Sequence, residues 1–306
     1  MAESLENRRR IEPAQWWVIG LAIAFMAGSV LYRYLTHSPY GRSAAMFIGI
    51  PAVLAVLLAL TPKAKTVTGG IIKGITLSLL VIAPLLGEGY LCILFAAPLF
   101  YLVGLLVGIP VDVARKRARN GQTLSCIVLL LVPMSLEGVA PQLAFDRRQT
   151  VEVTRVVNAS AARVEESLER SPRIEKRLPA FLRIGFPHPM EASGSGLGIG
   201  AERSVLFSGA EGDPAGWLVM QVAERKPGYV RFETVSDGSK LTQWIRWDAS
   251  EVNWAAVDAE HTSVTWRVHF ERQLDPAWYF ASWERGAVRQ AAGYLIEANA
   301  TPADMR

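Results

Sequence analysis

The four histidines are the first residues to examine for chemistry, because histidine is a common metal ligand and general base. A metal site needs several ligands brought together at characteristic spacings. The histidines here are scattered through the chain without such a spacing, and only two cysteines accompany them. They are His37, His188, His261 and His269. The sequence therefore predicts no metal site and no cofactor.

One segment alternates polar residues of the kinds that acid–base catalysis uses. Arg267, His269 and Glu271 occupy every second position of the segment 262–272, so in a strand they would share one face. The opposite face is apolar and carries Val264, Trp266, Val268 and Phe270. Because an apolar strand face meets the core, the pattern favours a solvated position for the polar face. We assign no catalytic residue, and we leave open an enzymatic role.

A glycine cluster is the other candidate for chemistry, since glycine-rich loops can cradle phosphate groups. It consists of Gly194, Gly196, Gly198 and Gly200. The phosphate-binding use requires a strand before the loop and a helix directly after it. Here a strand-like segment, 202–207, follows instead, and no G-x-S-x-G nucleophile motif occurs anywhere in the chain. The sequence favours a loop over the end of a sheet.

Charge and cysteine usage exclude several classes of protein. The net charge of +4 comes from the first half, because residues 1–145 hold 12 Lys and Arg against 6 Asp and Glu. Residues 146–306 hold 20 against 22, so they offer no basic face for nucleic acid. Cys92 and Cys126 both lie in apolar segments, which excludes a disulfide framework in the second half.

The first half is a series of apolar runs of the length that a helix needs to cross a bilayer. Trp16 and Trp17 at one end of the first run, and Tyr32 and Tyr34 at the other, are typical of residues at membrane interfaces. We expect residues 1–145 to form a transmembrane region of about five helices. Their predicted ranges are 16–35, 44–60, 71–86, 91–111 and 123–139.

The basic residues between the runs predict the orientation of an integral protein of the plasma (inner) membrane. With five spans, Arg8, Lys63 and Arg115, each with basic neighbours, share one side of the membrane. The more basic side faces the cytoplasm, which makes the second half extracytoplasmic. If the run 123–139 does not span, the second half is cytoplasmic instead.

The second half, 146–306, has the pattern of an α+β domain. A long helix at 275–298 carries an apolar stripe, and the segments before it alternate as an antiparallel sheet would. Before the sheet come a strand at 151–157, a helix from Ser160 and a short helix at 174–181. The expected strands of the sheet are 202–207, 216–224, 229–235, 241–248, 252–257 and 262–272.

This order of elements resembles the START-like superfamily, also called SRPBCC, which includes polyketide cyclase/dehydrase-type and lipid-transfer proteins. The residues that carry the resemblance are VEVTRVVNASAARVEESL, GIGAERSVLF and TSVTWRVHFERQLDPAWYFASWERGAVRQAAGYL, within 150–298. The resemblance implies a helix-grip fold, in which a curved sheet surrounds the last helix and encloses a deep apolar cavity. It does not extend to the membrane half.

A START-like domain beside a membrane suggests a protein that binds or transfers a hydrophobic ligand such as a lipid, isoprenoid or quinone. Such binding needs only apolar contact and no catalytic group. The partners expected are the lipid membrane and this small molecule, with no nucleic acid; protein partners are unknown. The expected ligand-binding residues are Val230, Phe232, Trp266, Phe270, Phe280, Trp283 and Ala287.

Two alternatives remain open. A cyclase or aromatase acting on a polyketide-like substrate would need polar side chains inside the cavity, for which Glu233, Gln243 and Arg246 are candidates. A non-catalytic partner of a membrane complex would instead fill the same space with its own side chains.

Overall fold

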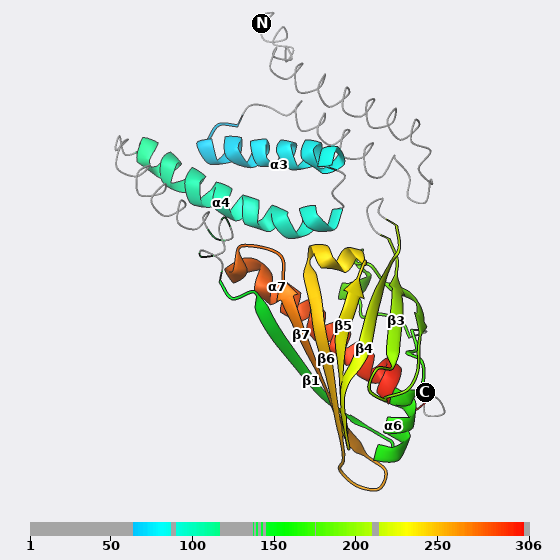
Figure 1. Cartoon of the computed structure of the whole chain (residues 1–306). Helices are drawn as coiled ribbons and strands as arrows, with labels where there is room; N and C mark the ends of the chain where they lie inside the picture. The colour runs from blue at the N-terminus through cyan, green and yellow to red at the C-terminus, as the bar shows by residue number, and fades with distance from the viewer. Residues whose placement is uncertain are drawn as a thin grey trace, which may run out of the picture. The chain divides into compact units, whose positions relative to one another are not determined.

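The chain divides into two compact units, residues 1–132 and 133–306 (Figure 1). The computed structural model describes residues 64–86, 90–116, 137, 139, 142, 145–174, 176–209 and 214–302. The predicted spans 16–35 and 44–60 lie outside the described residues, as does 123–139 apart from Glu137 and Val139. The five-helix count therefore stays a prediction.

In the first unit, two helices pack against each other: α3, Val67–Leu86, and α4, Tyr90–Lys116. Both begin before the ranges expected from hydropathy, and α4 also extends beyond its range. Asp112 on α4 explains the early start of α3, because its carboxylate accepts hydrogen bonds from the backbone N–H groups of Val67 (2.7 Å) and Thr68 (3.0 Å). The acid thus caps a helix N-terminus, where negative charge is stabilised.

The two helices approach closely at a pair of glycines four residues apart, Gly104 and Gly108. A Cβ atom at Gly108 would lie 2.7 Å from the Cα of Thr68, and one at Gly104 would lie 2.7 Å from Ile75 Cδ1. Small residues at this spacing are how membrane helices bring their backbones together. A hydrogen bond between Thr76 Oγ1 and the Tyr101 hydroxyl (2.9 Å) also joins the pair.

Among the described residues, one helical stretch, Ile93–Arg115, is long and apolar enough to cross a membrane. Its surface is mostly uncovered and presents large apolar side chains such as Leu94, Phe100 and Ile109. These properties fit a membrane-spanning helix, and they say nothing of its orientation.

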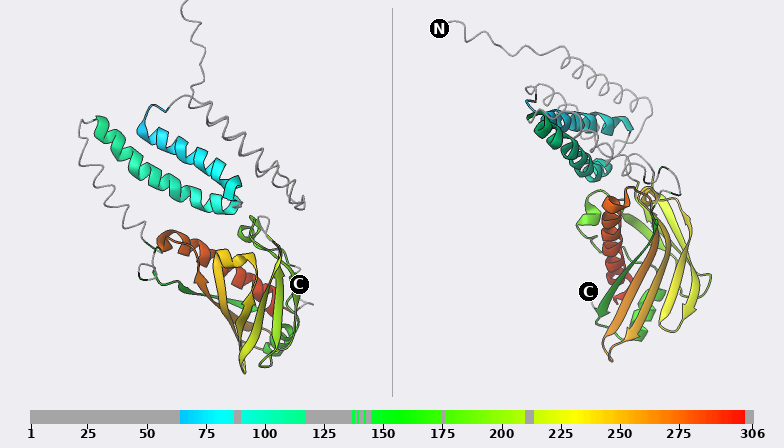
Figure 2. Two further views of the ribbon diagram at one scale, coloured as in Figure 1. Left: turned by 45° about the horizontal axis from the view of Figure 1, so that its top comes forward. Right: turned by 90° about the vertical axis from the view of Figure 1, so that its left-hand side faces the viewer.

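The second unit is a seven-stranded antiparallel sheet that curls around a long helix, α7 (Figure 2). The strand order is β1-β7-β6-β5-β4-β3-β2, so the first strand pairs with the last. This is the helix-grip arrangement, and it confirms the predicted α+β fold. The strands are β1 Arg148–Val157, β2 Pro189–Ser193, β3 Glu202–Phe207, β4 Gly216–Lys226, β5 Tyr229–Asp237, β6 Ile245–Ala256 and β7 Thr262–Arg272.

Helices close the ends of the sheet and fill its inner side. They are α6 Ala161–Glu169, η3 Phe181–Arg183, η4 Lys240–Gln243, α7 Ala277–Leu295 and η5 Ile296–Ala300. The apolar face of α6 consists of Val164 and Leu168. Both side chains belong to the core that the inner face of the sheet forms with α7 and η5.

Three sequence expectations differ from the structure. Segments 241–248 and 252–257 form one strand, β6, with an irregular register between Trp247 and Ala249. Trp244 and Trp247 would point to opposite faces of a regular strand, yet both are buried. Trp244 lies before the strand begins, and the irregular register follows Trp247. Among the described residues of the predicted helix 174–181, only the three-residue η3 begins, at its end. β2 pairs with β3 in a segment for which no strand was predicted.

Candidate functional site

The inner face of the sheet is a continuous apolar surface directed at α7. Along β7, every second residue from Thr262 to Arg272 is buried and the alternate residues are partly exposed. Phe232 on β5 and Val222 on β4 are direct cross-strand partners in this face. The strand faces predicted from the sequence are therefore correct. In aqueous solution, the apolar face of a sheet must pack against other parts of the protein.

The structure brings four of the seven predicted ligand-binding residues into one cluster on the inner face: Val230, Phe232, Trp266 and Phe270. Phe280 is buried on α7, and Ala287 on the same helix is partly buried. Trp283 lies apart from these residues, at the edge of the helix, and is 43% exposed.

The position of Trp283 follows from the rotation of α7. The residues that α7 buries include Phe280, Glu284, Val288 and Ala292, which places Glu284 in the centre of the stripe. Trp283 instead stacks on Phe181 of η3 with ring centroids 6.3 Å apart. Phe181 contacts Phe186, and Phe186 contacts Trp244, so four aromatic rings form a chain from α7 to the start of β6.

The interior also contains polar atoms that sequence analysis missed. Five buried atoms have no hydrogen-bond partner among the described residues: Arg203 Nε, Thr234 Oγ1, Asp237 Oδ2, Trp266 Nε1 and Glu284 Oε2. Most buried polar atoms in proteins are hydrogen-bonded, so each of these needs an explanation. The three polar residues proposed from the sequence, Glu233, Gln243 and Arg246, are all exposed, and that expectation is wrong.

Glu284 is the buried acid of this interior and is 5% exposed. Its Oε1 accepts a hydrogen bond from the backbone N–H of Leu274 at 3.3 Å. Burial raises the pKa of Glu284 to about 7, since the charged form loses its hydration and the Leu274 hydrogen bond compensates only in part. The side chain can therefore gain or lose a proton near neutral pH.

Arg203 is the buried cation and is 8% exposed. Its Nη2 donates to the carbonyl oxygens of Leu168 and, at 3.2 Å, of Gly196. Its guanidinium carbon lies 5.2 Å from the centre of the Phe232 ring. Desolvation lowers the pKa of Arg203 to about 10, although the charge of Glu169 opposes this shift.

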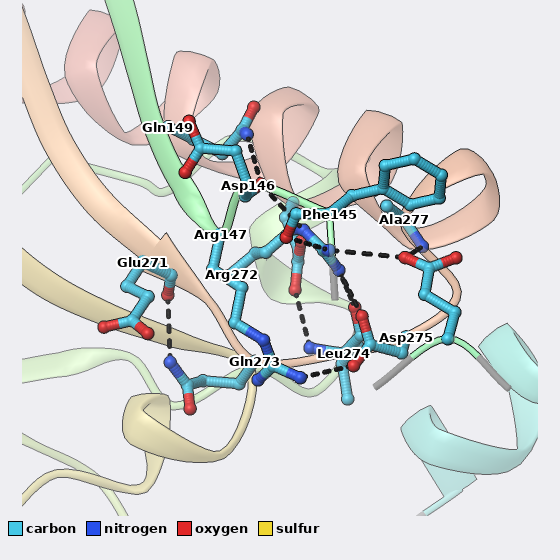
Figure 3. Close-up of polar contacts among 12 residues, drawn as sticks. Phe145, Asp146, Arg147, Gln149, Glu271, Arg272, Gln273, Leu274, Asp275 and Ala277 are labelled. Atoms are coloured by element: carbon cyan, nitrogen blue, oxygen red, sulfur yellow. Dashed lines mark hydrogen bonds and ion pairs between the residues drawn. The ribbon is translucent and has the colours of Figure 1, made fainter. Parts of the chain in front are cut away.

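A second buried arginine, Arg272, lies where β7 meets α7 (Figure 3). Its side chain is fully buried and donates to Asp275 Oδ1 (2.5 Å) and to the carbonyl oxygens of Leu274 (2.8 Å) and Phe145 (3.0 Å). Glu137 lies 3.3 Å away and Arg147 pairs with the other oxygen of Asp275. Every charge here has a partner, so this cluster is structural: it holds the chain entering the domain against the start of α7.

The outer face of the sheet contains the predicted acid–base residues. Glu251 on β6 accepts from Arg231 (2.7 Å), Arg267 (3.0 Å) and His269 Nε2 (3.0 Å), and Thr150 contacts His269 Nδ1 at 3.0 Å. Desolvation raises the pKa of Glu251, but the hydrogen bonds from Arg267 and His269 outweigh it and the pKa is lowered.

Glu271 on the same face pairs with Arg246 instead. Because these groups neutralise one another on the solvent side of the sheet, they form an ion-pair network away from the apolar interior.

In the glycine cluster, two of the four backbone N–H groups bond within the domain. The backbone N–H of Gly196 donates to Glu169 O (2.6 Å) and that of Gly200 to Val222 O (2.9 Å). Leu197 between them is buried in the core. Among the described residues there is no group of three His, Cys, Asp or Glu side chains that could hold a metal ion.

No protein-family model matches the sequence, and no curated protein sequence matches it. Solved structures of START-like proteins, a superfamily that includes the Bet v 1-like proteins, match the C-terminal half. A major latex-like protein from Panax ginseng is 11% identical, with 49% of this chain and 99% of that chain covered and a TM-score of 0.29.

An aromatase/cyclase from a Streptomyces species is 15% identical over 50% of this chain and 86% of that one, with a TM-score of 0.28. Norcoclaurine synthase from Thalictrum flavum, solved with dopamine and hydroxybenzaldehyde, is 13% identical over 49% and 85%, with a TM-score of 0.33.

Proposed function

We propose that this chain is a membrane-anchored START-like protein that binds or transfers a hydrophobic ligand, such as a lipid, an isoprenoid or a quinone, between its sheet and α7. The observation that carries the proposal is the set of unpaired polar atoms within an apolar interior. A protein that fills its core with its own side chains pairs such atoms or excludes them. A guest molecule, with or without water, would supply the missing partners.

Apolar contact supplies the affinity in this proposal. Each Å² of apolar ligand surface removed from water contributes roughly 25 cal/mol, so a long chain needs no catalytic group to be held. The seven predicted residues take two roles. Val230, Phe232, Trp266, Phe270 and Phe280 would contact the ligand in the interior, whereas Ala287 and Trp283 would contact it at the edge of α7.

The membrane half completes the proposal. We propose that α3 and α4 are two of about five spans and that they keep the domain beside the bilayer, where hydrophobic ligands dissolve. A tether of this kind raises the effective concentration of the domain at the membrane. We propose an extracytoplasmic domain, and a cytoplasmic one if 123–139 does not span. Labelling a cysteine introduced at exposed Asp258 in sealed vesicles distinguishes the two locations.

The binding experiment compares two tryptophan substitutions on α7. Ala287→Trp adds bulk on the flank of the helix that meets the interior, and Ser282→Trp adds the same bulk on the opposite, exposed side. The full chain is purified in nanodiscs, and bound apolar molecules are extracted and identified by mass spectrometry. We expect a stoichiometric ligand in the wild type and in Ser282→Trp, and at least about tenfold less in Ala287→Trp. A wild-type protein without an extractable apolar molecule would contradict the proposal.

Glu284 favours a second candidate, a cyclase-type enzyme. A buried carboxyl group whose pKa is about 7 suits general acid–base catalysis at neutral pH. Under this alternative, Glu284→Gln would abolish turnover of a polyketide-like substrate while leaving its binding intact. Under the binding proposal, Glu284→Gln still binds the ligand, and neither the wild type nor the variant turns over a substrate.

A further inference from the structure

We infer that the interior of the second unit contains a carboxylate-binding subsite at Arg203, so that the ligand is an amphiphile with a carboxylate at one end of an apolar chain. The inference rests on the proposed ligand-binding function and specifies the polar end of the ligand. No sequence motif marks this residue. It follows from where β3 places the side chain and from what surrounds it.

The sheet register places Arg203 on the inner face. Arg203 on β3 is opposite Met220 on β4, and Met220 is opposite Thr234 on β5. Directly opposed residues of antiparallel strands share a face, so these three residues form one row across the inner side. Phe232, two residues before Thr234, lies under the guanidinium. The Arg203 side chain therefore extends across β4 toward β5, where Thr234 is the next inward residue.

The charge of Arg203 is buried without a counter-ion. Among the residues that the structure describes, its polar contacts are the two carbonyl oxygens of Leu168 and Gly196, and no carboxylate pairs with it. The Glu169 charge acts on it only from a distance. A buried charge is costly unless it is paired, because it loses its hydration. This contrasts with Arg272, which is also buried and has Asp275 and Glu137 as partners.

One nitrogen of the guanidinium has no hydrogen-bond partner among the described residues. Nη2 is held by the carbonyl at the end of α6 and by the glycine loop, which fixes the side chain in place. Nε is buried and unpaired, and so is the hydroxyl oxygen of Thr234. A carboxylate between them would accept from both groups and neutralise the guanidinium, and charge-assisted hydrogen bonds of this kind are strong. The apolar chain of the same molecule would lie along Phe232 and the neighbouring inner face.

The competing explanation is that Arg203 only clamps α6 to the glycine loop. A clamp uses Nη2 alone, and it predicts no preference for an anionic ligand. The two explanations therefore differ in how the protein treats two ligands that share a chain and differ in charge.

The test uses the full chain in phosphatidylcholine nanodiscs with two photo-cross-linking probes. One is palmitic acid with a diazirine in its chain, and the other is the methyl ester of the same molecule. Cross-linked peptides from residues 202–237 are quantified by mass spectrometry across a titration of each probe. We expect the wild type to bind the acid at least about tenfold more tightly than the ester.

Two variants locate the preference. Arg203→Gln should weaken acid binding to the level of the ester while leaving ester binding unchanged, and the retained ester binding shows that the domain is folded. Thr234→Val, which keeps the charge and removes the hydroxyl, should weaken acid binding about threefold.

Equal binding of acid and ester by the wild type would overturn the carboxylate subsite and leave the hydrophobic-ligand function standing. A preference for the acid that survives in Arg203→Gln would also overturn it. If neither probe labels the domain, the proposed function fails and the subsite fails with it.

Discussion

The carboxylate of Glu137 accepts a hydrogen bond of 2.8 Å from the backbone N–H of Ala277, the first residue of α7. A residue that precedes the first strand thus caps the long helix α7, 140 positions later in the chain. Glu137 also lies 3.3 Å from the fully buried Arg272. Glu137 is therefore part of the folded structure of the domain.

Replacing Glu137 tests this anchoring role. Glu137→Ala removes the cap of α7 and one partner of a buried charge, so we expect the domain to lose about 2–4 kcal/mol of stability. Thermal unfolding of the full chain, followed by tryptophan fluorescence, measures the effect, because seven of the nine tryptophans lie in 146–306. Glu260→Ala, in the exposed β6–β7 turn, should change the midpoint little. Similar midpoints for both variants would contradict the role.

Glu284 predicts how stability depends on pH. Its pKa is about 7 in the folded domain, against 4.5 as the ordinary value, so the folded state retains a proton that the unfolded state loses. The contribution of the Glu284 proton to the free energy of unfolding is fully present below pH 4.5. It is lost as the pH rises through about 7. The difference amounts to about 3 kcal/mol at most.

Glu284→Gln is the matched variant, because its amide stays neutral. The wild type should lose stability relative to Glu284→Gln between about pH 4.5 and pH 7, with no further relative change above that range. A constant difference between the two proteins over this range would show that Glu284 titrates at its ordinary pKa.

Two tryptophans that sequence analysis placed together should differ in their effects on stability. Trp266 is buried on β7, so Trp266→Ala should cost about 3–5 kcal/mol. Trp283 is exposed at the edge of α7, and Trp283→Ala removes mainly the stacking of its ring on Phe181. This substitution should lower the stability by about 1 kcal/mol. Chemical denaturation of both variants measures the difference. Equal losses would mean that Trp283 belongs to the core.

His269 should have no part in ligand binding, since it lies on the outer face of the sheet. His269→Ala removes one of three groups that donate to or contact Glu251 and leaves Arg231 and Arg267 in place. We expect unchanged ligand content by lipid extraction and a stability loss of about 1 kcal/mol. Loss of ligand in this variant, with the fold intact, would revive the acid–base hypothesis.

The packing of α3 on α4 predicts how strongly each of three glycine substitutions disrupts the contact between the two helices. Gly108→Ala should be the most disruptive, because its Cβ would meet the backbone of Thr68. Gly104→Ala should be milder, since its Cβ would meet the flexible end of Ile75, and Gly74→Ala should be neutral because no atom lies within 4 Å. Hydrogen exchange of residues 67–70 in nanodiscs reports the contact. An equal effect at Gly74 and Gly108 would contradict the close approach.

The sequence by itself determined the strand parity and the fold class. Alternation in 262–272 identified the face of β7 that carries Trp266 and Phe270, because a strand has only two faces and one of them must be covered. The sequence did not determine the rotation of α7, because apolar residues at steps of three and four fit several rotations of a helix. The sequence places Trp283 inside, whereas the structure buries Glu284 and leaves Trp283 exposed.

Only the tertiary structure decided which polar residues are buried. Arg203, Arg272 and Glu284 are charged residues, which sequence patterns assign to the surface, and each is buried in the folded domain. Arg272 meets Glu137 and Phe145, and Glu284 meets Leu274. Arg203 meets the end of α6 and the glycine loop. Local propensity carries no information about such partners, because the cost of burying a charge depends on what the folded chain places beside it.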